Sequence, residues 1–200
     1  MSRSLYLALV RHAATEWTAA GRVQGQSDPP LSAEGEAQAG GWRLPADLTR
    51  LHEAGSLGWA ASPLQRAAAT ARRLGATAPL LDPRLMERHY GAWQGRPLAE
   101  VEAWLEDGGW DSRPPGGESS GEVLARVRAW VDEVAAGPGP ETWVVVTHLG
   151  VIRALIAAAV DWDFRAPAPL RFLPERLHRV RRRGDGHLQL ITLNEPLAAL

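Results

Sequence analysis

The chain has 200 residues, of which 45% are hydrophobic, and its formal net charge at pH 7 is −1. This length is enough for one domain with a sizeable core over residues 1–200, and the near-zero charge argues against general nucleic-acid binding. Cysteine and lysine are both missing, which excludes disulfides, thiolate metal sites, Schiff-base chemistry and the lysine of phosphate-binding loops.

Strands and helices alternate in the predicted secondary structure. Strands are expected over 5–10, 57–61, 79–82, 143–147, 177–181 and 187–193. Helices are expected over 33–44, 63–74, 97–107, 118–136 and 150–160. This alternation predicts an α/β fold with three layers, α/β/α, around a mostly parallel central sheet.

Two of the predicted helices begin with capping residues. Ser32 is expected to be the N-cap of the helix over 33–44. The stretch Ser62-Pro63-Leu64-Gln65 combines serine, proline at the first helical position and glutamine at the third, which is the pattern of a capping box. Arg66 would then lie in the first turn of its helix, where backbone N–H groups are unpaired.

The chain lacks the patterns of a membrane or secreted protein. No apolar run reaches the length that spans a bilayer, and the first residues do not resemble a signal peptide. We therefore expect a cytoplasmic protein with no membrane partner.

Basic and proton-carrying side chains follow three of the predicted strands. Arg11 and His12 end the first strand, His148 ends the fourth, and Arg66 opens the helix after the second. Ligands of α/β sheets bind beyond the carboxyl ends of the strands, close to helix N-termini. These residues therefore predict an anion pocket, and the forked donors of arginine suit phosphate well.

Six motifs occur along the chain in a fixed order. They are Arg11-His12-Ala13; Gly21-Arg22 with Gly25, Pro30-Leu31-Ser32 and Gly35; Ser62-Pro63-Leu64-Gln65-Arg66-Ala67 with Thr70-Ala71; Leu85-Met86-Glu87 with Gly91-Ala92-Trp93 and Gly95; Gly116-Gly117-Glu118-Ser119; and Val145-Val146-Thr147-His148-Leu149-Gly150. Together they resemble the histidine phosphatase superfamily, which contains the cofactor-dependent phosphoglycerate mutases and many phosphatases. The resemblance spans residues 5–160 and implies a phosphoglycerate mutase-like fold.

The resemblance implies a role for each residue of the pocket. His12 resembles the nucleophile that accepts the phosphoryl group, and Arg11, Arg66 and His148 resemble the clamp around the phosphoryl oxygens. Glu87 resembles the acid that protonates the leaving oxygen and then the base for the attacking water. Further substrate contacts are implied for Thr18, Gln24, Gly25, Arg88, Tyr90 and Leu149. Because arginine and histidine can stabilise the transferred group, no metal and no cofactor are expected.

Four positions depart from the family's pattern. Ala13 stands where glycine usually follows the nucleophile, and Ala14 stands where a polar residue is common. Thr18 replaces an asparagine that helps to hold phosphate, and Leu149 replaces the glycine after the second histidine. We expect these changes to affect substrate range and rate more than the class of reaction.

Three functions stay open at this point. The favoured one is a phosphatase that hydrolyses small phosphorylated metabolites through a phosphohistidine on His12, similar to α-ribazole phosphatase-like or broad-specificity enzymes. The second is a cofactor-dependent phosphoglycerate mutase, because the stretch 87–91 is close to the mutase version, although the longer insertion and lysine of mutases are missing. The third is a phospholigand-binding module without turnover. The expected partner is a small phosphate ester rather than nucleic acid, and a homodimer is left open.

Three other patterns have simpler interpretations. The stretch Gly117-Glu118-Ser119-Ser120-Gly121 fits the G-x-S-x-G motif of serine hydrolases, but a loop rather than a strand precedes it, so Ser119 is expected to cap the next helix. The four arginines within 179–183 are expected at a solvated hairpin end. His52, His178 and His187 are expected at the surface.

Overall fold

The computed structural model describes residues 3–166 and 168–199, without the side chains of residues 108, 198 and 199. A six-stranded sheet has the order β4-β3-β5-β1-β6-β7, and a second sheet pairs β2 with β8. The strands are β1 (Leu5–Arg11), β2 (Trp42–Arg43), β3 (Leu57–Ala61), β4 (Leu80–Leu81), β5 (Thr142–Thr147), β6 (Arg176–Arg182), β7 (Leu188–Pro196) and β8 (Ala198–Ala199). The pairs from β4 to β1 are parallel, whereas β6 and β7 are antiparallel to their neighbours.

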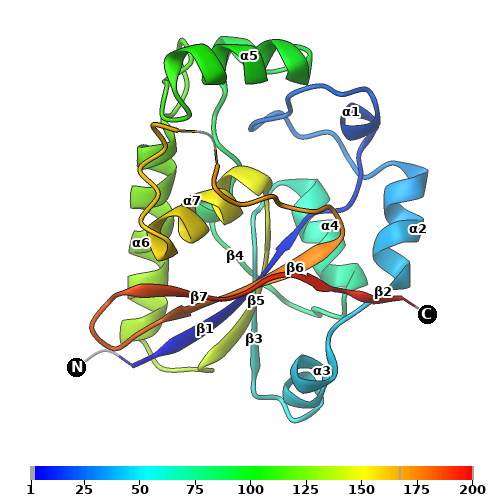
Figure 1. The fold of residues 1–200 in the computed structure, drawn as a ribbon. Coiled ribbons are helices and arrows are strands. Elements are labelled where there is room, and N and C mark those ends of the chain that lie inside the picture. The colour runs from blue at the N-terminus through cyan, green and yellow to red at the C-terminus, as the bar shows by residue number, and fades with distance from the viewer. Residues whose placement is uncertain (1–2, 167, 200) are drawn as a thin grey trace.

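Helices cover both faces of the six-stranded sheet (Figure 1). They are α1 (Glu16–Ala19), α2 (Ala33–Gly41), α3 (Ala46–Glu53), α4 (Gln65–Arg73), α5 (Leu98–Gly108), α6 (Ser120–Ala136) and α7 (Leu149–Ala159), with short 3-10 turns η1 (Pro83–Leu85) and η2 (Gly91–Trp93). The helices α6 and α7 lie on one face, and α2, α3 and α4 on the other, while α5 lies above the carboxyl ends of the parallel strands. The expected three-layer α/β fold is confirmed, and its sheet is mixed.

Side chains of β1 alternate between the two layers because a strand has a period of two residues. Leu5, Leu7 and Leu9 belong to the core that includes α6 and α7, whereas Ala8 and Val10 belong to the core that includes α4. All five are at most 2% exposed. Burial on both faces explains why this strand is apolar from Leu7 to Val10.

The register of β1 and β5 places two of the predicted site residues side by side. Arg11 pairs with Thr147, so His12 and His148, which follow them, leave the sheet at the same edge. The backbone N–H of His12 also donates to the carbonyl of Thr147 at 2.9 Å. On the other side of β5, β3 ends at this edge too, and Ser62 leads from it into α4.

One predicted helix ends early. The helix expected over 33–44 stops at Gly41, because Trp42 and Arg43 form β2 and pair with β8 near the end of the chain. A partner more than 150 residues away is invisible to the local apolar pattern. The short helices α1 and α3 are not predicted at all, since four and eight residues are too few for a clear apolar period.

The start of α4 also differs from the expectation. This helix begins at Gln65, and the expected capping box at Ser62 is absent. The Ser62 hydroxyl instead accepts the N–H of Leu64 at 3.3 Å, and the Asp28 carboxylate accepts the N–H of Gln65 at 2.9 Å. A side chain from a distant loop thus satisfies the helix N-terminus, and Arg66 still lies in the first turn.

The late hairpin of β6 and β7 is less exposed than expected. His178 is only 2% exposed, and its Nδ1 accepts the N–H of Asn194 at 3.1 Å. Burial lowers the pKa of His178 to about 4. Arg179 forms ion pairs with Asp47 at 2.5 Å and Glu195 at 2.6 Å. The surface assignment of His178 is therefore wrong, and this arginine is paired within the fold.

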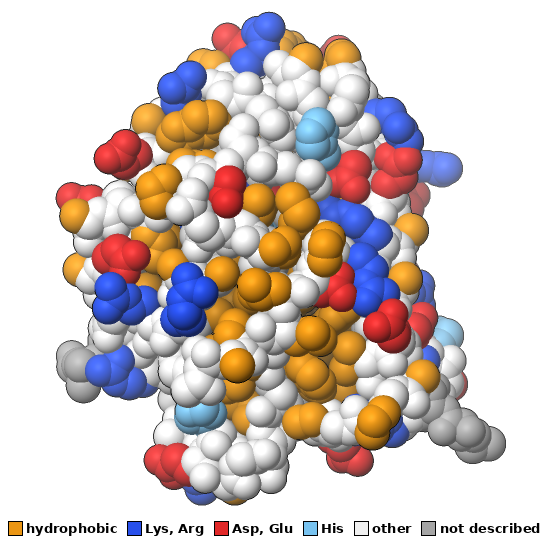
Figure 2. Space-filling view, turned by 180° about the vertical axis from the view of Figure 1, so that it is seen from behind, with side chains coloured by type: hydrophobic (Ala, Val, Ile, Leu, Met, Phe, Trp, Pro, Cys, Tyr) orange, Lys and Arg blue, Asp and Glu red, His pale blue; other side chains and the backbone are white. Residues whose placement is uncertain are grey.

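Figure 2 shows the side of the molecule opposite to Figure 1, where hydrophobic side chains gather in a band through the middle and charged side chains surround them. Exposed hydrophobic residues include Leu80 and Leu81 of the edge strand β4, at 48% and 47%. Throughout residues 3–166 and 168–199, no helix combines the length and the apolar character needed to cross a bilayer.

Candidate active site

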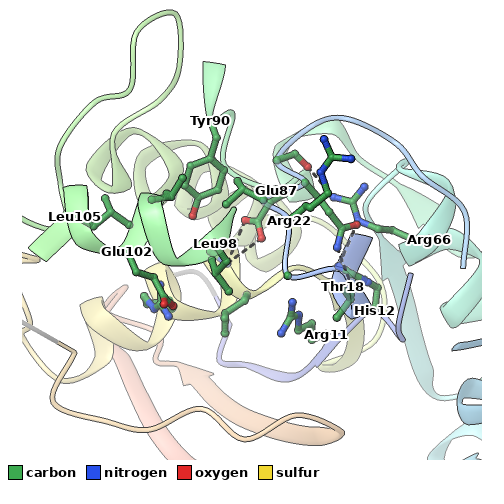
Figure 3. Close-up of a pocket in the computed structure, with 18 of the residues that line it drawn as sticks. Arg11, His12, Thr18, Arg22, Arg66, Glu87, Tyr90, Leu98, Glu102 and Leu105 are labelled. Atoms are coloured by element: carbon green, nitrogen blue, oxygen red, sulfur yellow. Dashed lines mark hydrogen bonds between the residues drawn. The ribbon is translucent and has the colours of Figure 1, made fainter. Parts of the chain in front are cut away.

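A cavity opens at the carboxyl ends of β1 and β5, beside the N-termini of α4 and α7 (Figure 3). Arg11, His12, Arg66 and Glu87 line it, although they come from different parts of the chain. The helix α5 forms part of the opposite wall and contributes Leu98, Val101, Glu102 and Leu105. Their spacing of three and four residues places them on one helix face. The structure thus brings four of the residues with predicted catalytic roles to one cavity.

His12 is held in a single tautomer. Its Nδ1 lies 2.7 Å from the carbonyl oxygen of Ala13, which can only accept, so Nδ1 carries the hydrogen. Its other ring nitrogen, Nε2, is therefore unprotonated and carries the lone pair. Burial holds the pKa of His12 well below its ordinary value, and the positive charges of Arg11 and Arg66 lower it further. The imidazole is neutral at pH 7, as a nucleophile must be.

The backbone after His12 is fixed by helices on both sides. The N–H of Ala13 donates to Thr70 Oγ1 at 3.1 Å, and that hydroxyl donates to the carbonyl of Arg66 at 2.7 Å. The methyl group of Ala13 is 2% exposed and packs in the core that includes α4. A Cβ at Gly35 of α2 would lie 1.9 Å from the carbonyl oxygen of Ala14, so α2 can press directly on this loop. Alanine at position 13 therefore fills core space rather than cavity space.

Arg66 is buried and its guanidinium is fully oriented. Its Nε donates to His12 Nε2 at 3.3 Å, and its two terminal nitrogens donate to the carbonyls of Ser27 and Gly25, each at 2.7 Å. Asp28 lies 3.6 Å away as an ion-pair partner. Burial lowers the pKa of Arg66, but a guanidinium remains charged in proteins. This residue therefore holds a fixed positive charge against His12.

His148 lies next to His12 and is not among the residues that line the cavity. It is fully buried, and the two ring centroids are 5.1 Å apart. Neither of its ring nitrogens has a hydrogen-bond partner within the described residues. Burial, followed by the neighbouring His12 and arginines, holds the pKa of His148 well below its ordinary value. Two unpaired buried nitrogens are costly, so a ligand that supplied a partner for them would be favoured.

The carboxylate of Glu87 is held by two backbone amides. Its Oε1 accepts the N–H of Arg88 at 2.8 Å and the N–H of Gly150, in the first turn of α7, at 3.1 Å. A Cβ at Gly150 would lie 2.3 Å from the same oxygen. The missing side chain at position 150 therefore lets Glu87 reach the helix N-terminus. Figure 3 shows Glu87 between Tyr90 and the group formed by Arg11 and His12.

Most of the predicted substrate contacts line the cavity; these residues are Thr18, Gln24, Gly25, Tyr90 and Leu149. The Thr18 hydroxyl accepts the side-chain N–H of Gln24 at 3.0 Å and the N–H of Thr15 at 3.2 Å. It therefore helps to cap α1, and this cap positions the loop that reaches Gly25. Gly25 has a φ of +54°, which favours glycine at that turn.

Arg88 is placed differently from the expectation. It is 3% exposed and is not among the residues that line the cavity. Its guanidinium donates to the carbonyls of Glu118 at 2.8 Å and Trp110 at 3.2 Å, and to that of Ser112. Its charge also lies over the ring of Tyr90, 5.1 Å from the centroid. The structure thus assigns Arg88 to the support of the loop over 109–118 rather than to the substrate.

The cavity is also lined by charged residues to which the sequence patterns assign no role. Arg153 lies on α7, one turn beyond Gly150, and the negative charge of Glu102 on α5 acts on it across the cavity. Arg22 lines the cavity from the loop after α1. The spacing of four residues from Leu149 to Arg153 could have indicated a shared helix face. Which face of α7 meets the cavity depends on how this helix packs on the sheet.

The serine of the G-x-S-x-G pattern has a structural role. Ser119 is the N-cap of α6, and its hydroxyl accepts the N–H of Glu122 at 3.2 Å. The Glu122 carboxylate accepts the N–H of Ser119 at 2.9 Å, which completes a capping box. The expected cap is confirmed.

Comparison with known proteins finds a family match over most of the chain. The sequence model of the histidine phosphatase superfamily (branch 1) matches residues 7–196. Bifunctional protein Rv2228c of Mycobacterium tuberculosis is 36% identical over 166 residues, which cover 78% of this chain and 44% of that protein. The chain thus spans less than half the length of this relative.

Other relatives match over most of their own length. Probable phosphoglycerate mutase GpmB of Serratia proteamaculans is 35% identical over 186 residues, covering 88% of this chain and 84% of that one. Glucosyl-3-phosphoglycerate phosphatase of Mycobacterium tuberculosis is 37% identical over 177 residues, covering 78% and 75%. The solved structure of mycobacterial glucosyl-3-phosphoglycerate phosphatase Rv2419c with VO3 has a TM-score of 0.77 at 31% identity, covering 97% of this chain and 100% of that one.

Proposed function

The chain belongs to the histidine phosphatase superfamily, and on that premise we propose that it hydrolyses small phosphate monoesters through a phosphohistidine on His12, without a metal ion. The state of His12 carries the proposal. Its Nδ1 is tied to a backbone carbonyl, its pKa is depressed, and Nε2 lies beside Arg66 at the cavity. A neutral imidazole fixed in one tautomer is ready to attack phosphorus at neutral pH.

In the first step, His12 Nε2 forms a bond to phosphorus, and the bond from phosphorus to the ester oxygen breaks. Charge spreads over the phosphoryl oxygens, and the positive charges of Arg11 and Arg66 stabilise it. The N–H of Arg66 that donates to His12 Nε2 in the free protein turns to a phosphoryl oxygen. Although His148 does not line the cavity of the free protein, its ring centroid is 5.1 Å from that of His12, so a phosphoryl group on His12 would bring an oxygen toward one of its unpaired ring nitrogens. The clamp thus needs no group beyond these side chains.

Glu87 supplies and recovers the proton. In its acid form it gives a proton to the departing ester oxygen, and the alcohol leaves. As a carboxylate it then takes a proton from a water molecule, whose oxygen attacks phosphorus while the bond from phosphorus to Nε2 breaks. Inorganic phosphate leaves, and both residues return to their first state. The backbone donors of Arg88 and Gly150 keep the carboxyl group in place through both steps.

The wall formed by α5 favours hydrolysis over mutase activity. A mutase must hold a bisphosphorylated intermediate, which calls for further cations around the second phosphate. Besides the clamp, the cavity is lined by the cations Arg22, which already donates to the Gly95 carbonyl, and Arg153, whereas α5 faces it with three apolar side chains and the carboxylate of Glu102. This wall supports a phosphatase, in which water rather than a second hydroxyl accepts the phosphoryl group.

The test is hydrolysis of a panel of small phosphate monoesters in excess chelator, with wild type and His12→Ala. Rapid quenching should trap a phosphoprotein that is labile in acid and stable in alkali, and His12→Ala should abolish both this species and turnover. The exposed His187 gives a matched control, since His187→Ala should behave as wild type. Wild-type turnover by His12→Ala would refute the proposal. Faster interconversion of 3- and 2-phosphoglycerate than hydrolysis would identify a mutase, and binding without turnover would identify a binding module.

A further inference from the structure

Four arginines line the cavity, and they differ in whether the protein already satisfies them. Arg66 donates to two carbonyls and to His12, and Arg22 donates to the carbonyl of Gly95 at 2.8 Å. Arg11 and Arg153 have no side-chain hydrogen bond or ion pair within residues 3–166 and 168–199. In the proposed reaction Arg11 binds the phosphoryl group, whereas Arg153 has no role in either step.

The guanidinium of Arg153 is held by aromatic rings. Its central carbon lies 4.6 Å from the centroid of the Trp110 ring and 5.8 Å from that of Phe172. Contacts of this kind fix the plane of a guanidinium while its N–H groups stay available at the edge. The Nε of Arg153 is buried and has no acceptor among the residues that the structure describes. An oriented cation with unused donors is suited to a planar anion that arrives with a ligand.

The position of Arg153 on α7 indicates which part of a bound substrate it would contact. On α7 it lies three residues after Gly150, whose N–H holds Glu87, and residues at this spacing share a helix face. Glu87 is the proposed proton donor to the ester oxygen. The carbon skeleton of the leaving alcohol must therefore begin next to Glu87. Arg153 lies about one turn of α7 away from Gly150, so a short skeleton can reach its guanidinium.

We propose that Arg153 is a specificity-determining residue that binds a carboxylate on the leaving alcohol, so that the preferred substrates are small phosphorylated carboxylic acids. The inference rests on the proposed function and adds its substrate class. A planar carboxylate can accept two parallel N–H groups from the edge of one guanidinium.

The surroundings favour a carboxylate over the alternatives. A second phosphate would place two charges against one unsatisfied guanidinium, with the carboxylate of Glu102 opposing them from α5. On the α5 wall a neutral sugar would find hydrogen-bonding groups only at Glu102, because Leu98, Val101 and Leu105 are apolar. A single negative charge on a short skeleton satisfies Arg153 and leaves these apolar walls in contact with carbon.

The test compares two phosphoesters with the same three-carbon skeleton, 3-phosphoglycerate and glycerol 3-phosphate. Wild type should have the higher kcat/KM for the acid, mainly through a lower KM. In Arg153→Met, the side chain still packs on Trp110 but lacks charge, and the preference should fall by about 10- to 100-fold, the range expected for a charge-assisted hydrogen bond. Arg153→Lys, which keeps the charge, should retain part of the preference that Arg153→Met loses. A purely structural role of the side chain predicts no such difference between the two variants.

Arg22→Met is the matched control, because it removes another cation from the same cavity. It should change kcat/KM by the same factor for both substrates, so that the ratio of the two kcat/KM values stays as in wild type. No preference in wild type, or an unchanged preference in Arg153→Met, would overturn the inference. Loss of the preference in Arg22→Met instead would also overturn it.

A binding measurement separates this inference from the proposed function. Calorimetric titration of His12→Ala with each phosphoester needs no turnover. The acid should bind more tightly than the alcohol, and the difference should vanish in the double variant that adds Arg153→Met. If wild type hydrolyses no phosphate monoester of the panel but this binding difference is present, the proposed function fails and the role of Arg153 stands. Equal binding of the two compounds refutes the role of Arg153.

Discussion

Gly150→Ala tests whether catalysis depends on the close approach of Glu87 to α7. The added Cβ would lie 2.3 Å from Glu87 Oε1 and 3.3 Å from its carboxyl carbon. A normal carbon–oxygen contact is about 3.3 Å, so the carboxylate must retreat by about 1 Å. The hydrogen bond of 3.1 Å from the Gly150 N–H would be lost in the process. The helix itself should gain, because alanine is the better helix former.

A misplacement of about 1 Å in a catalytic group can cost about 100-fold in rate. We therefore expect kcat/KM for an alkyl phosphate to fall by roughly this factor, with the melting temperature kept or raised. The loss should be much smaller for p-nitrophenyl phosphate, because its phenolate leaves without needing a proton. Steady-state kinetics gives kcat/KM for both substrates, and thermal unfolding gives the melting temperature of the variant.

Gly40→Ala is the control for this variant. Gly40 lies within α2, and a Cβ there would meet nothing within 4 Å. It should leave the kinetics unchanged. If Gly150→Ala hydrolyses the alkyl phosphate at the wild-type rate, or loses equal activity on both substrates, the assigned role of Glu87 is refuted.

Two further predictions concern the support of the site and the pH dependence of stability. Arg88→Met should lower the melting temperature, because three partly buried carbonyls lose their donor, while KM for phosphoesters stays close to wild type; a raised KM at unchanged stability would show that Arg88 contacts substrate. The pKa of His178 is about 4 in the folded chain and lies below its unfolded value, so only the unfolded chain binds this proton between pH 6.5 and 4. Stability from this residue is complete above pH 6.5 and falls by about 3 kcal/mol toward pH 4. Urea unfolding at pH 7 and 4.5 should show a smaller loss in His178→Gln than in wild type, and equal losses would contradict the assignment.

Local sequence signals were enough to predict the part of the site that lies at strand ends. The apolar run of β1 shows where that strand ends, so Arg11 and His12 could be placed at the edge of the sheet. The same reasoning placed His148 after β5. Ser119 was predicted as a cap because the capping box is complete within four residues. In each case the residues that determine the position of the side chain are close in sequence, and the regular spacing of the strand or helix then shows where that side chain lies.

The fate of the remaining charged residues depended on contacts between distant segments. Arg88 is adjacent to Glu87 in sequence, yet carbonyls from residues 110–118 draw its guanidinium away from the cavity. Arg153 stands outside the motifs quoted for the resemblance, yet the packing of α7 and the ring of Trp110 place its guanidinium in the cavity. The end of α2 at Gly41 likewise depends on pairing with β8.

The sequence by itself determined that this chain has an α/β fold with arginine and histidine at its strand ends. Only the tertiary structure decided which of the other charges face the ligand. Strand ends and caps follow from residues next to each other, whereas the direction of a long side chain follows from whichever acceptors the folded chain brings within its reach.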